Sequence, residues 1–188
     1  MGMTLSGMVL LLSKIIIAEG IVRRMEKPLR TLAVIMQRRN ARSRWAEVIW
    51  EPVSVHESGE ARGEARLLMR QDDIEQWLHP GFEVAIHRDE IEGYYMNVSS
   101  GSPRVFVLWR MDGEQGDQDA ARGVPLQLTA SYDEGGRWLD GGHSVDSVTM
   151  PPAIFGWIGD YVEKNYRPEP KKRIKPRSFV HPKDRIGR

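Results

Sequence analysis

Residues Phe82–Asp112 constrain the fold most strongly, because apolar and polar side chains alternate along most of this stretch. The alternation predicts three consecutive β-strands, at Phe82–His87, Gly93–Val98 and Arg104–Met111. Two short polar connections separate these strands. The third strand is apolar on both faces, so we expect it to be central in its sheet and covered on both sides.

Further strands are predicted on both sides of this stretch, at Leu29–Met36, Trp45–Val55, Leu67–Met69 and Pro125–Tyr132. Pro52 has no N–H to donate to a ladder, so its strand is expected at a sheet edge or at a bulge. Residues 133–149 contain two Gly-Gly pairs and are predicted to form turns.

Two helices are predicted. Asp72 and Glu75 have the spacing of a capping box, which predicts a short helix that carries Ile74, Trp77 and Leu78 on one face. A longer amphipathic helix is predicted at Met150–Tyr166, where apolar residues recur at helical spacing: Ile154, Trp157, Ile158, Tyr161 and Val162. Its two glycines each cost about 1 kcal/mol relative to alanine, so this helix is expected to need docking on the sheet.

These elements predict a mainly β (α+β) domain over residues 29–166. Its architecture is expected to be a curled antiparallel sheet or a partly open barrel, packed by the C-terminal amphipathic helix. The pleckstrin-homology-like barrel has the same order of elements, an analogy of fold that carries no function. Residues 1–28 form an uncertain N-terminal extension, and residues 167–188 form a basic, proline-rich tail that is expected to be disordered.

The composition excludes several kinds of chemistry. The chain has no cysteine, so it cannot form disulfides, thiol nucleophiles or thiolate metal sites. Its formal net charge of +1 hides an asymmetry, because the tail from Arg167 holds nine basic and two acidic residues. The domain between the ends is therefore acidic, and its terminal segments are basic.

The N-terminal segment is apolar between Val9 and Ile17 but contains Lys14. No basic region precedes the apolar run, so it is a poor signal peptide, and it is too short to span a membrane. A membrane-surface anchor is a second interpretation, but we expect translation to start at Met25 and the protein to be cytoplasmic without a membrane partner.

Two clusters of titratable residues could carry chemistry. Asp140, His143 and Asp146 could surround a small cation, although their spacing is not diagnostic and two Gly-Gly pairs more often make a tight polar loop. The carboxylates at the expected hairpin tip around Asp89 could do acid–base work. Charged tips are common, however, and no nucleophile or oxyanion site accompanies this one. We therefore expect no metal, no cofactor and no catalysis.

The basic tail, with Phe179 among its cations, could bind nucleic acid or an acidic protein, or could simply keep the chain soluble. The acidic domain would repel a phosphate backbone, so nucleic acid is the least expected partner. Trp45 and Tyr95 lie opposite the main apolar faces and are expected to be exposed contacts. The residues expected to bind a partner are Arg38, Arg39, Trp45, His79, Arg88, Asp89, Glu90, Glu92, Tyr95, Lys171, Lys172 and Arg173.

Several strings together resemble a family of bacterial proteins known as domain of unknown function 3305. They are Arg38-Arg39, Trp45–Trp50, Leu78–Gly81, Arg88–Glu90 with Glu92–Tyr95, Ser131–Glu134, Trp138–Gly142 and Tyr166–Lys172. The resemblance implies a protein encoded beside genes for molybdenum-dependent formate dehydrogenase, with no established activity. Some such proteins carry a label for molybdopterin-guanine dinucleotide biosynthesis, but Met36–Asn40 lacks the glycine-rich turn that a nucleotidyltransferase needs.

The sequence therefore predicts a non-catalytic accessory protein that acts by binding another protein. The resemblance implies that this partner is a formate dehydrogenase subunit or another maturation factor. The alternative is a barrel that binds a small ligand or cofactor such as a pterin or a nucleotide, and the third hypothesis is nucleic-acid binding through the tail.

Overall fold

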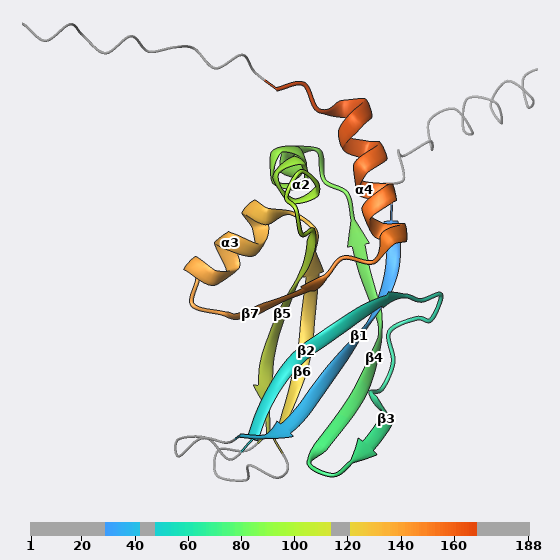
Figure 1. Cartoon of the computed structure of the whole chain (residues 1–188), viewed down its shortest axis with the longest axis vertical. Helices are drawn as coiled ribbons and strands as arrows, with labels where there is room; N and C mark the ends of the chain where they lie inside the picture. The colour runs from blue at the N-terminus through green and yellow to red at the C-terminus, as the bar shows by residue number, and fades with distance from the viewer. Residues whose placement is uncertain (1–28, 42–47, 114–120, 169–188) are drawn as a thin grey trace, which may run out of the picture.

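The computed structural model describes residues 29–41, 48–113 and 121–168, which form two antiparallel sheets with helices gathered at one end (Figure 1). The first sheet has the order β2-β1-β4-β3, and its strands are β1 (Leu29–Asn40), β2 (Val48–Glu57), β3 (Arg66–Gln71) and β4 (Ile74–Ala85). The second has the order β6-β5-β7, and its strands are β5 (Arg104–Asp112), β6 (Arg122–Thr129) and β7 (Ser144–Thr149).

The helices at that end are η1 (Arg88–Glu90), α2 (Ile91–Val98), α3 (Tyr132–Asp140) and α4 (Pro152–Asn165). α2 lies between α3 and α4 and contacts both. No helix within the described ranges is long and apolar enough to cross a membrane.

The two sheets face each other around one core. β4 lies beside β6, and β2 lies beside β7. Within the described residues no ladder of hydrogen bonds joins the sheets, so the barrel is not closed. The core takes Leu32, Val34 and Met36 from β1 together with Val105 and Val107 from β5. The mainly β, antiparallel architecture predicted from the sequence is confirmed at this level.

Several predicted elements are present. β5 is the central strand of its sheet, as its two apolar faces predict. β2 is an edge strand of the first sheet, and its ladder with β1 shifts register at Met36 and Pro52, in agreement with the missing proline N–H. The helix predicted at Met150–Tyr166 is present as α4, which buries Ile154, Ile158 and Val162 in the common core.

The strand predicted at Gly93–Val98 is wrong, because these residues belong to α2. Tyr94 and Asn97 are buried, whereas Met96, which follows Tyr94 in the strand pattern, is 40% exposed. Buried residues three positions apart indicate a helix. The expected charged hairpin tip at Asp89–Glu92 is consequently the short helix η1 and the first turn of α2.

The helix predicted at Asp72–Leu78 is also wrong. Asp72 and Asp73 form a two-residue turn between β3 and β4, in which Gln71 pairs with Ile74. Asp72 has a φ of 52°, a left-handed conformation that aspartate tolerates better than most residues. Its capping-box spacing therefore marks a hairpin turn, and Ile74–Leu78 begin β4.

The turns predicted at residues 133–149 are instead α3 and β7. Ser131 caps α3, since its hydroxyl accepts a hydrogen bond from the Glu134 N–H at 3.2 Å. Ser131-x-x-Glu134 is the spacing of a capping box, so the sequence did carry a signal for this helix.

Candidate functional site

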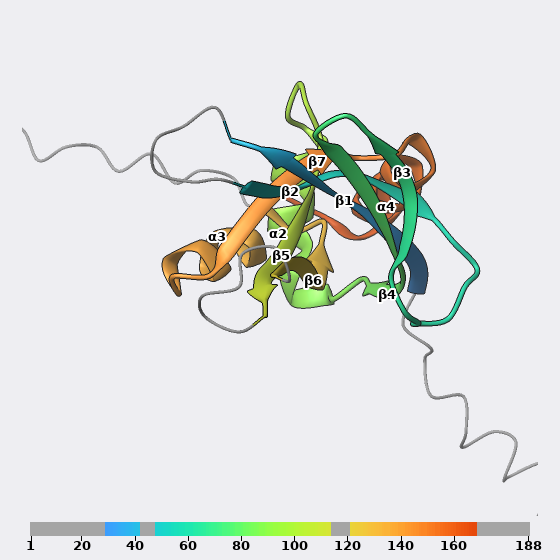
Figure 2. The same ribbon diagram turned by 90° about the horizontal axis from the view of Figure 1, so that it is seen from below.

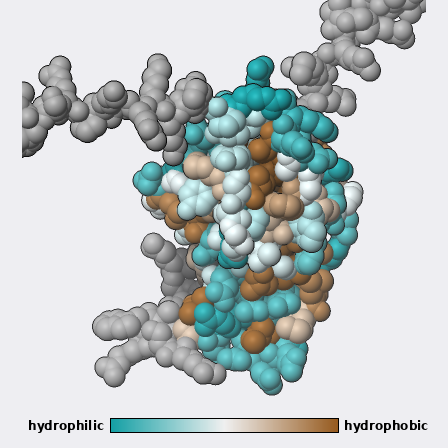
Figure 3. Space-filling model, turned by 45° about the horizontal axis from the view of Figure 1, so that its top comes forward, coloured by the Kyte–Doolittle hydropathy of each residue, from teal (hydrophilic) through white to brown (hydrophobic). Residues whose placement is uncertain are grey.

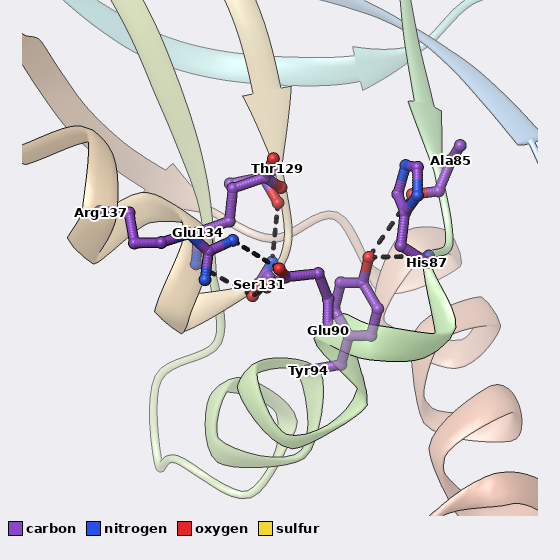
Figure 4. Close-up of polar contacts among 8 residues, drawn as sticks. All are labelled: Ala85, His87, Glu90, Tyr94, Thr129, Ser131, Glu134 and Arg137. Carbon is purple, nitrogen blue, oxygen red and sulfur yellow. Dashed lines mark hydrogen bonds and ion pairs between the residues drawn. The ribbon is translucent and has the colours of Figure 1, made fainter.

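Glu90 links η1 and α2 to α3 through hydrogen bonds at the helical end of the molecule (Figure 4). Its side chain is only 13% exposed and accepts hydrogen bonds from the Ser131 hydroxyl at 2.6 Å and from the Arg137 guanidinium at 2.5 Å. The same Ser131 hydroxyl caps α3, and Ser131 is fully buried. This hydroxyl is engaged on both sides and has no contact with solvent, so the cluster is a structural latch and not a nucleophile with its base.

Tyr94 and Asn97 of α2 extend this latch into the two sheets. The Tyr94 hydroxyl accepts a hydrogen bond from the His87 backbone N–H at 3.2 Å, and burial raises the pKa of Tyr94 to about 12. Asn97 is 1% exposed and bonds the backbone of Arg104 on β5 and the carbonyl of Ala130 just beyond β6. Each buried polar group here has its partner inside the domain, as a fixed scaffold requires.

β3 is the most exposed strand, and all six of its residues, Arg66–Gln71, are exposed. In the described part of the chain it pairs with β4 alone, so its other edge is open, as Figure 1 and Figure 2 show. Leu67, Leu68 and Met69 are 40%, 51% and 37% exposed. An open edge with consecutive apolar side chains is a template for pairing with another strand. We call Arg66–Gln71 the β3 edge.

Other exposed apolar side chains are more scattered. On the face shown in Figure 3, hydrophobic patches are bordered by hydrophilic surface. The helices expose apolar residues too: Tyr95 and Met96 on α2, Tyr132 and Leu139 on α3, and Phe155 on α4. Scattered exposed apolar residues are ordinary on a protein surface. None of these helices exposes three large apolar residues in succession, as β3 does.

A cleft of about 600 Å³ lies between β4 and β6, and α3 contributes Glu134 and Trp138 to its lining. Residues on its walls include Arg62, Phe82, His87, Leu128, Glu134 and Trp138. Arg62 stacks on the ring of Phe82, with the guanidinium 4.6 Å from the ring centroid. The volume is in the range of small-molecule sites, and the walls offer both apolar and charged groups.

A family model described as "Protein of unknown function (DUF3305)" matches residues 31–175, more than half of the chain. The chain belongs to this family. No curated protein and no solved structure matches it. The description of this family names no activity, so it assigns none to this DUF3305 protein.

The predicted contact residues of this DUF3305 protein fall into separate places. Arg88, Asp89 and Glu92 are exposed around the start of α2, while Glu90 belongs to the latch. Tyr95 is 39% exposed and stacks on Tyr166, with ring centroids 4.4 Å apart. Trp45 and the basic triplet Lys171, Lys172 and Arg173 lie outside the described residues.

Arg38 and His79 come closer together than their sequence numbers suggest. Both point toward the space between the sheets, since Arg38 follows Met36 by two residues on β1 and His79 pairs with Val34. Burial, then the charges of Arg122 and Arg62, lower the pKa of His79 to about 4. Arg39 lies on the opposite face of β1 and pairs with Glu51 at 2.8 Å.

The three candidate metal ligands, Asp140, His143 and Asp146, lie on different elements. Asp140 ends α3, His143 lies in the turn that follows, and Asp146 on β7 accepts a hydrogen bond from the Trp109 indole at 2.7 Å. Across the described ranges, no group of three or more histidines and carboxylates is arranged to hold a metal ion.

The sequence pattern of this DUF3305 protein did not predict the open, exposed edge of β3. It predicted a short strand at Leu67–Met69 but not its exposure. The available signal was the absence of alternation, because three consecutive apolar residues on a strand must place at least one of them on each face. It also missed Arg62 and Arg122, whose charges converge on His79 from distant parts of the chain.

Proposed function

We propose that the protein is a non-catalytic accessory protein that binds an extended segment of another protein along the β3 edge. The observation that carries this proposal is the exposure of all six residues of an edge strand, with three large apolar side chains in succession. Strand addition at such an edge forms main-chain hydrogen bonds, and the neighbouring side chains select the partner.

The chemistry of the β3 edge defines the segment it would accept. Apolar side chains of the segment would cover Leu67, Leu68 and Met69, which would remove their surface from water. Arg66 and Arg70 flank these residues. Arg66 forms an ion pair with Glu60 at 2.8 Å, and Arg70 forms one with Glu75 at 3.0 Å. Both arginine side chains remain more than half exposed, so they favour a segment with acidic residues at its ends.

The proposed partner is a subunit of a molybdenum-dependent formate dehydrogenase or another factor in the maturation of that enzyme. The support for this partner is the gene setting implied by the family resemblance, and the support for the binding mode is the β3 edge. The two supports are independent, so either half of the proposal can fail alone.

Co-purification from cells that express the dehydrogenase tests the proposal. The wild-type protein is expected to retain a dehydrogenase subunit or maturation factor, and Leu68→Lys is expected to lose it. Leu139→Lys is the matched control, because Leu139 is exposed to the same degree, 53% against 51%, but lies on α3. Equal retention by both variants would contradict binding at the β3 edge.

The β3 edge could also pair with a second copy of the chain. The proposal predicts a monomer in solution when no partner is present. Light scattering coupled to size-exclusion chromatography measures this directly. A dimer that Leu68→Lys converts to a monomer would contradict the proposal, because the edge would then be occupied by the protein itself.

The cleft between β4 and β6 favours a second candidate function, the binding of a small ligand such as a pterin or a nucleotide. Its volume and its mixed apolar and charged walls support this function. A ligand that binds the folded state raises the melting temperature in a concentration-dependent way. A thermal-shift screen with pterins and nucleotides distinguishes the two candidates, since Leu68→Lys would leave such a shift unchanged.

A further inference from the structure

The cleft beside β4 follows an edge of β6. In the described part of the chain β6 pairs with β5 alone, so its other edge has no neighbouring strand. Four consecutive residues of β6, Leu126–Thr129, line the cleft. Consecutive residues on a strand point to opposite faces, so a hollow that touches all four lies along the edge of the strand. We call Leu126–Thr129 the β6 edge.

The ladder between β5 and β6 is interrupted where the β6 edge begins. Leu108 pairs with Gln127, and Trp109 pairs with Pro125. Leu126 is therefore left without a residue opposite it on β5, which makes it the extra residue of a β-bulge. Pro125 adds to the interruption because it has no N–H to donate. The bulge places the start of the β6 edge partly outside the ladder.

Arg62 reaches the β6 edge from the loop between β2 and β3. Its guanidinium donates to the Leu126 carbonyl at 3.5 Å and lies over the Phe82 ring of β4, 4.6 Å from the ring centroid. The loop packs directly on Gly81 of β4, where a Cβ would overlap the backbone of Arg62. Gly81 also has a φ of 81°, which favours glycine. Arg62 therefore joins the two sheets across the cleft.

The Arg62 side chain also stands between two hollows. A second hollow, of about 340 Å³, lies next to the cleft, and both are lined by Arg62 and Phe82. The second hollow follows the first half of β6, with Arg122 and Val124 in its lining. Because Arg62 lines both hollows, its movement away from β6 would join them into one groove along the strand.

We propose that the β6 edge binds an extended segment of a partner protein and that Arg62 holds the place of one N–H of that segment. The main-chain groups of a strand edge are matched by another main chain, which is the basis of strand addition. An N–H of the segment would take the Leu126 carbonyl from Arg62, whose bond is long and exposed to solvent. Alternate side chains of the segment would lie on Phe82, Leu128 and Trp138, so we expect apolar residues at alternate positions.

The cleft is continuous with the β3 edge. Glu60, in the cleft lining, forms an ion pair at 2.8 Å with Arg66, the first residue of β3. The ladder between β3 and β4 ends at the pair Arg66–Leu78, and Gly81–Glu83 of β4 line the cleft just beyond it. A protein that lies along the β3 edge therefore meets the cleft directly. The inference goes beyond the β3 edge and does not depend on it, because β6 belongs to the other sheet.

A peptide selected from a random display library is the probe. The bait is the full chain with Leu68→Lys, which blocks the β3 edge. We expect the selected peptides to carry apolar residues at alternate positions, and a synthetic copy to protect amides of the β6 edge from hydrogen exchange. Failure to enrich any peptide, or protection that leaves the β6 edge unchanged, would overturn the proposal.

Isothermal titration of the same peptide tests the role of Arg62. Arg62→Ala is expected to bind it about fivefold more tightly, because the guanidinium no longer competes for the Leu126 carbonyl. Arg110→Ala is the matched control, because Arg110 is an exposed arginine on β5 that pairs with Asp112 outside the cleft lining. Affinity in Arg62→Ala that is no higher than in Arg110→Ala would show that Arg62 does not hold the place of the segment.

The terminal segments of the chain and a second copy of it are the other occupants to be distinguished. Peptide binding that appears only after deletion of residues 1–28 or 169–188 would show that the chain fills its own cleft. A dimer that the peptide dissociates, measured by light scattering, would place a second copy there. Either result would overturn the assignment of the β6 edge to a partner protein.

Discussion

His79 couples the stability of the domain to pH. Its pKa in the folded protein, about 4, lies below the value of 6.5 for an ordinary histidine, so the unfolded chain binds a proton more readily. The folded state is favoured fully above about pH 6.5, and this contribution is lost as the pH falls toward 4. His79→Gln is expected to remove it.

The pH effect can be measured as the free energy of unfolding in urea at pH 7 and pH 5. For the wild-type protein we expect a loss on the order of 1 kcal/mol from His79, allowing for its partial exposure to solvent. His143→Gln is the control, because His143 is exposed in the turn after α3. The same pH dependence in wild type and His79→Gln would contradict this account of the imidazole.

Asn97 is the residue whose loss should cost the domain most among its polar side chains. Its amide donates to the carbonyls of Arg104 and Ala130 at 2.7 Å each and accepts from the Arg104 N–H at 2.9 Å. Asn97→Ala would leave these buried backbone groups unpaired, so we expect a loss of about 2–4 kcal/mol in the free energy of unfolding.

Asn165→Ala is the matched control for Asn97, because Asn165 makes one exposed bond, to the Tyr161 carbonyl at 2.8 Å. Its cost is expected to stay below about 0.5 kcal/mol. Denaturant unfolding of the two variants under identical conditions measures the difference. Equal costs would mean that Asn97 does not hold α2 to the sheets.

Close packing of α2 against α3 depends on Gly93. A Cβ at this position would lie 2.3 Å from the Ser131 hydroxyl and 3.0 Å from the Asp133 backbone nitrogen. Gly93→Ala is therefore expected to destabilise the domain by about 1–3 kcal/mol, although alanine is the better helix former. Gly156→Ala on α4 should do the opposite and stabilise by up to about 1 kcal/mol, because nothing lies within 4 Å of its Cβ.

Thermal unfolding of Gly93→Ala and Gly156→Ala separates intrinsic helix propensity from packing. Both changes add the same methyl group inside a helix, so a difference in sign reports the surroundings alone. If both variants were stabilised, α2 would not be packed tightly against α3.

Whether an element could be predicted depended on where its contacts come from. β1, β5 and α4 were predictable because their apolar patterns are long and repeated within one element. α2 was not, since Tyr94, Met96 and Val98 also satisfy a strand pattern and only the contacts of Gly93 and Asn97 with residues near Ser131 decide for a helix. The start of β4 was mistaken for a helix because a hairpin turn and a helix cap favour the same aspartate.

The same reasoning applies to the candidate sites. Arg38 and His79 were selected from the sequence, but Trp50, Arg70 and Arg122 were not, because they line a hollow to which five strands, β1, β2, β3, β4 and β6, contribute. The β3 edge was predictable as a strand, whereas its position at the edge depends on the sheet order β2-β1-β4-β3. Local patterns predict elements, and tertiary pairing creates the sites.

At the scale of the whole molecule, the two regions of the domain have different characters. The helical end is fastened by the Glu90–Ser131–Arg137 latch and by Asn97, with its polar groups paired internally. The β3 edge exposes apolar side chains, and between the sheets the buried Trp50 indole is a donor without a hydrogen-bond partner in the described part of the chain. Such a division suits a protein whose helical end is a rigid scaffold and whose sheets bind the partner.

The central claim is that the β3 edge binds a protein that takes part in the maturation of formate dehydrogenase. The most direct measurement is formate dehydrogenase activity in a strain that lacks this gene, complemented with wild type, Leu68→Lys or Leu139→Lys at matched protein levels. We predict that wild type and Leu139→Lys restore activity and that Leu68→Lys does not. Normal activity in the uncomplemented deletion strain, or full restoration by Leu68→Lys, would contradict the claim.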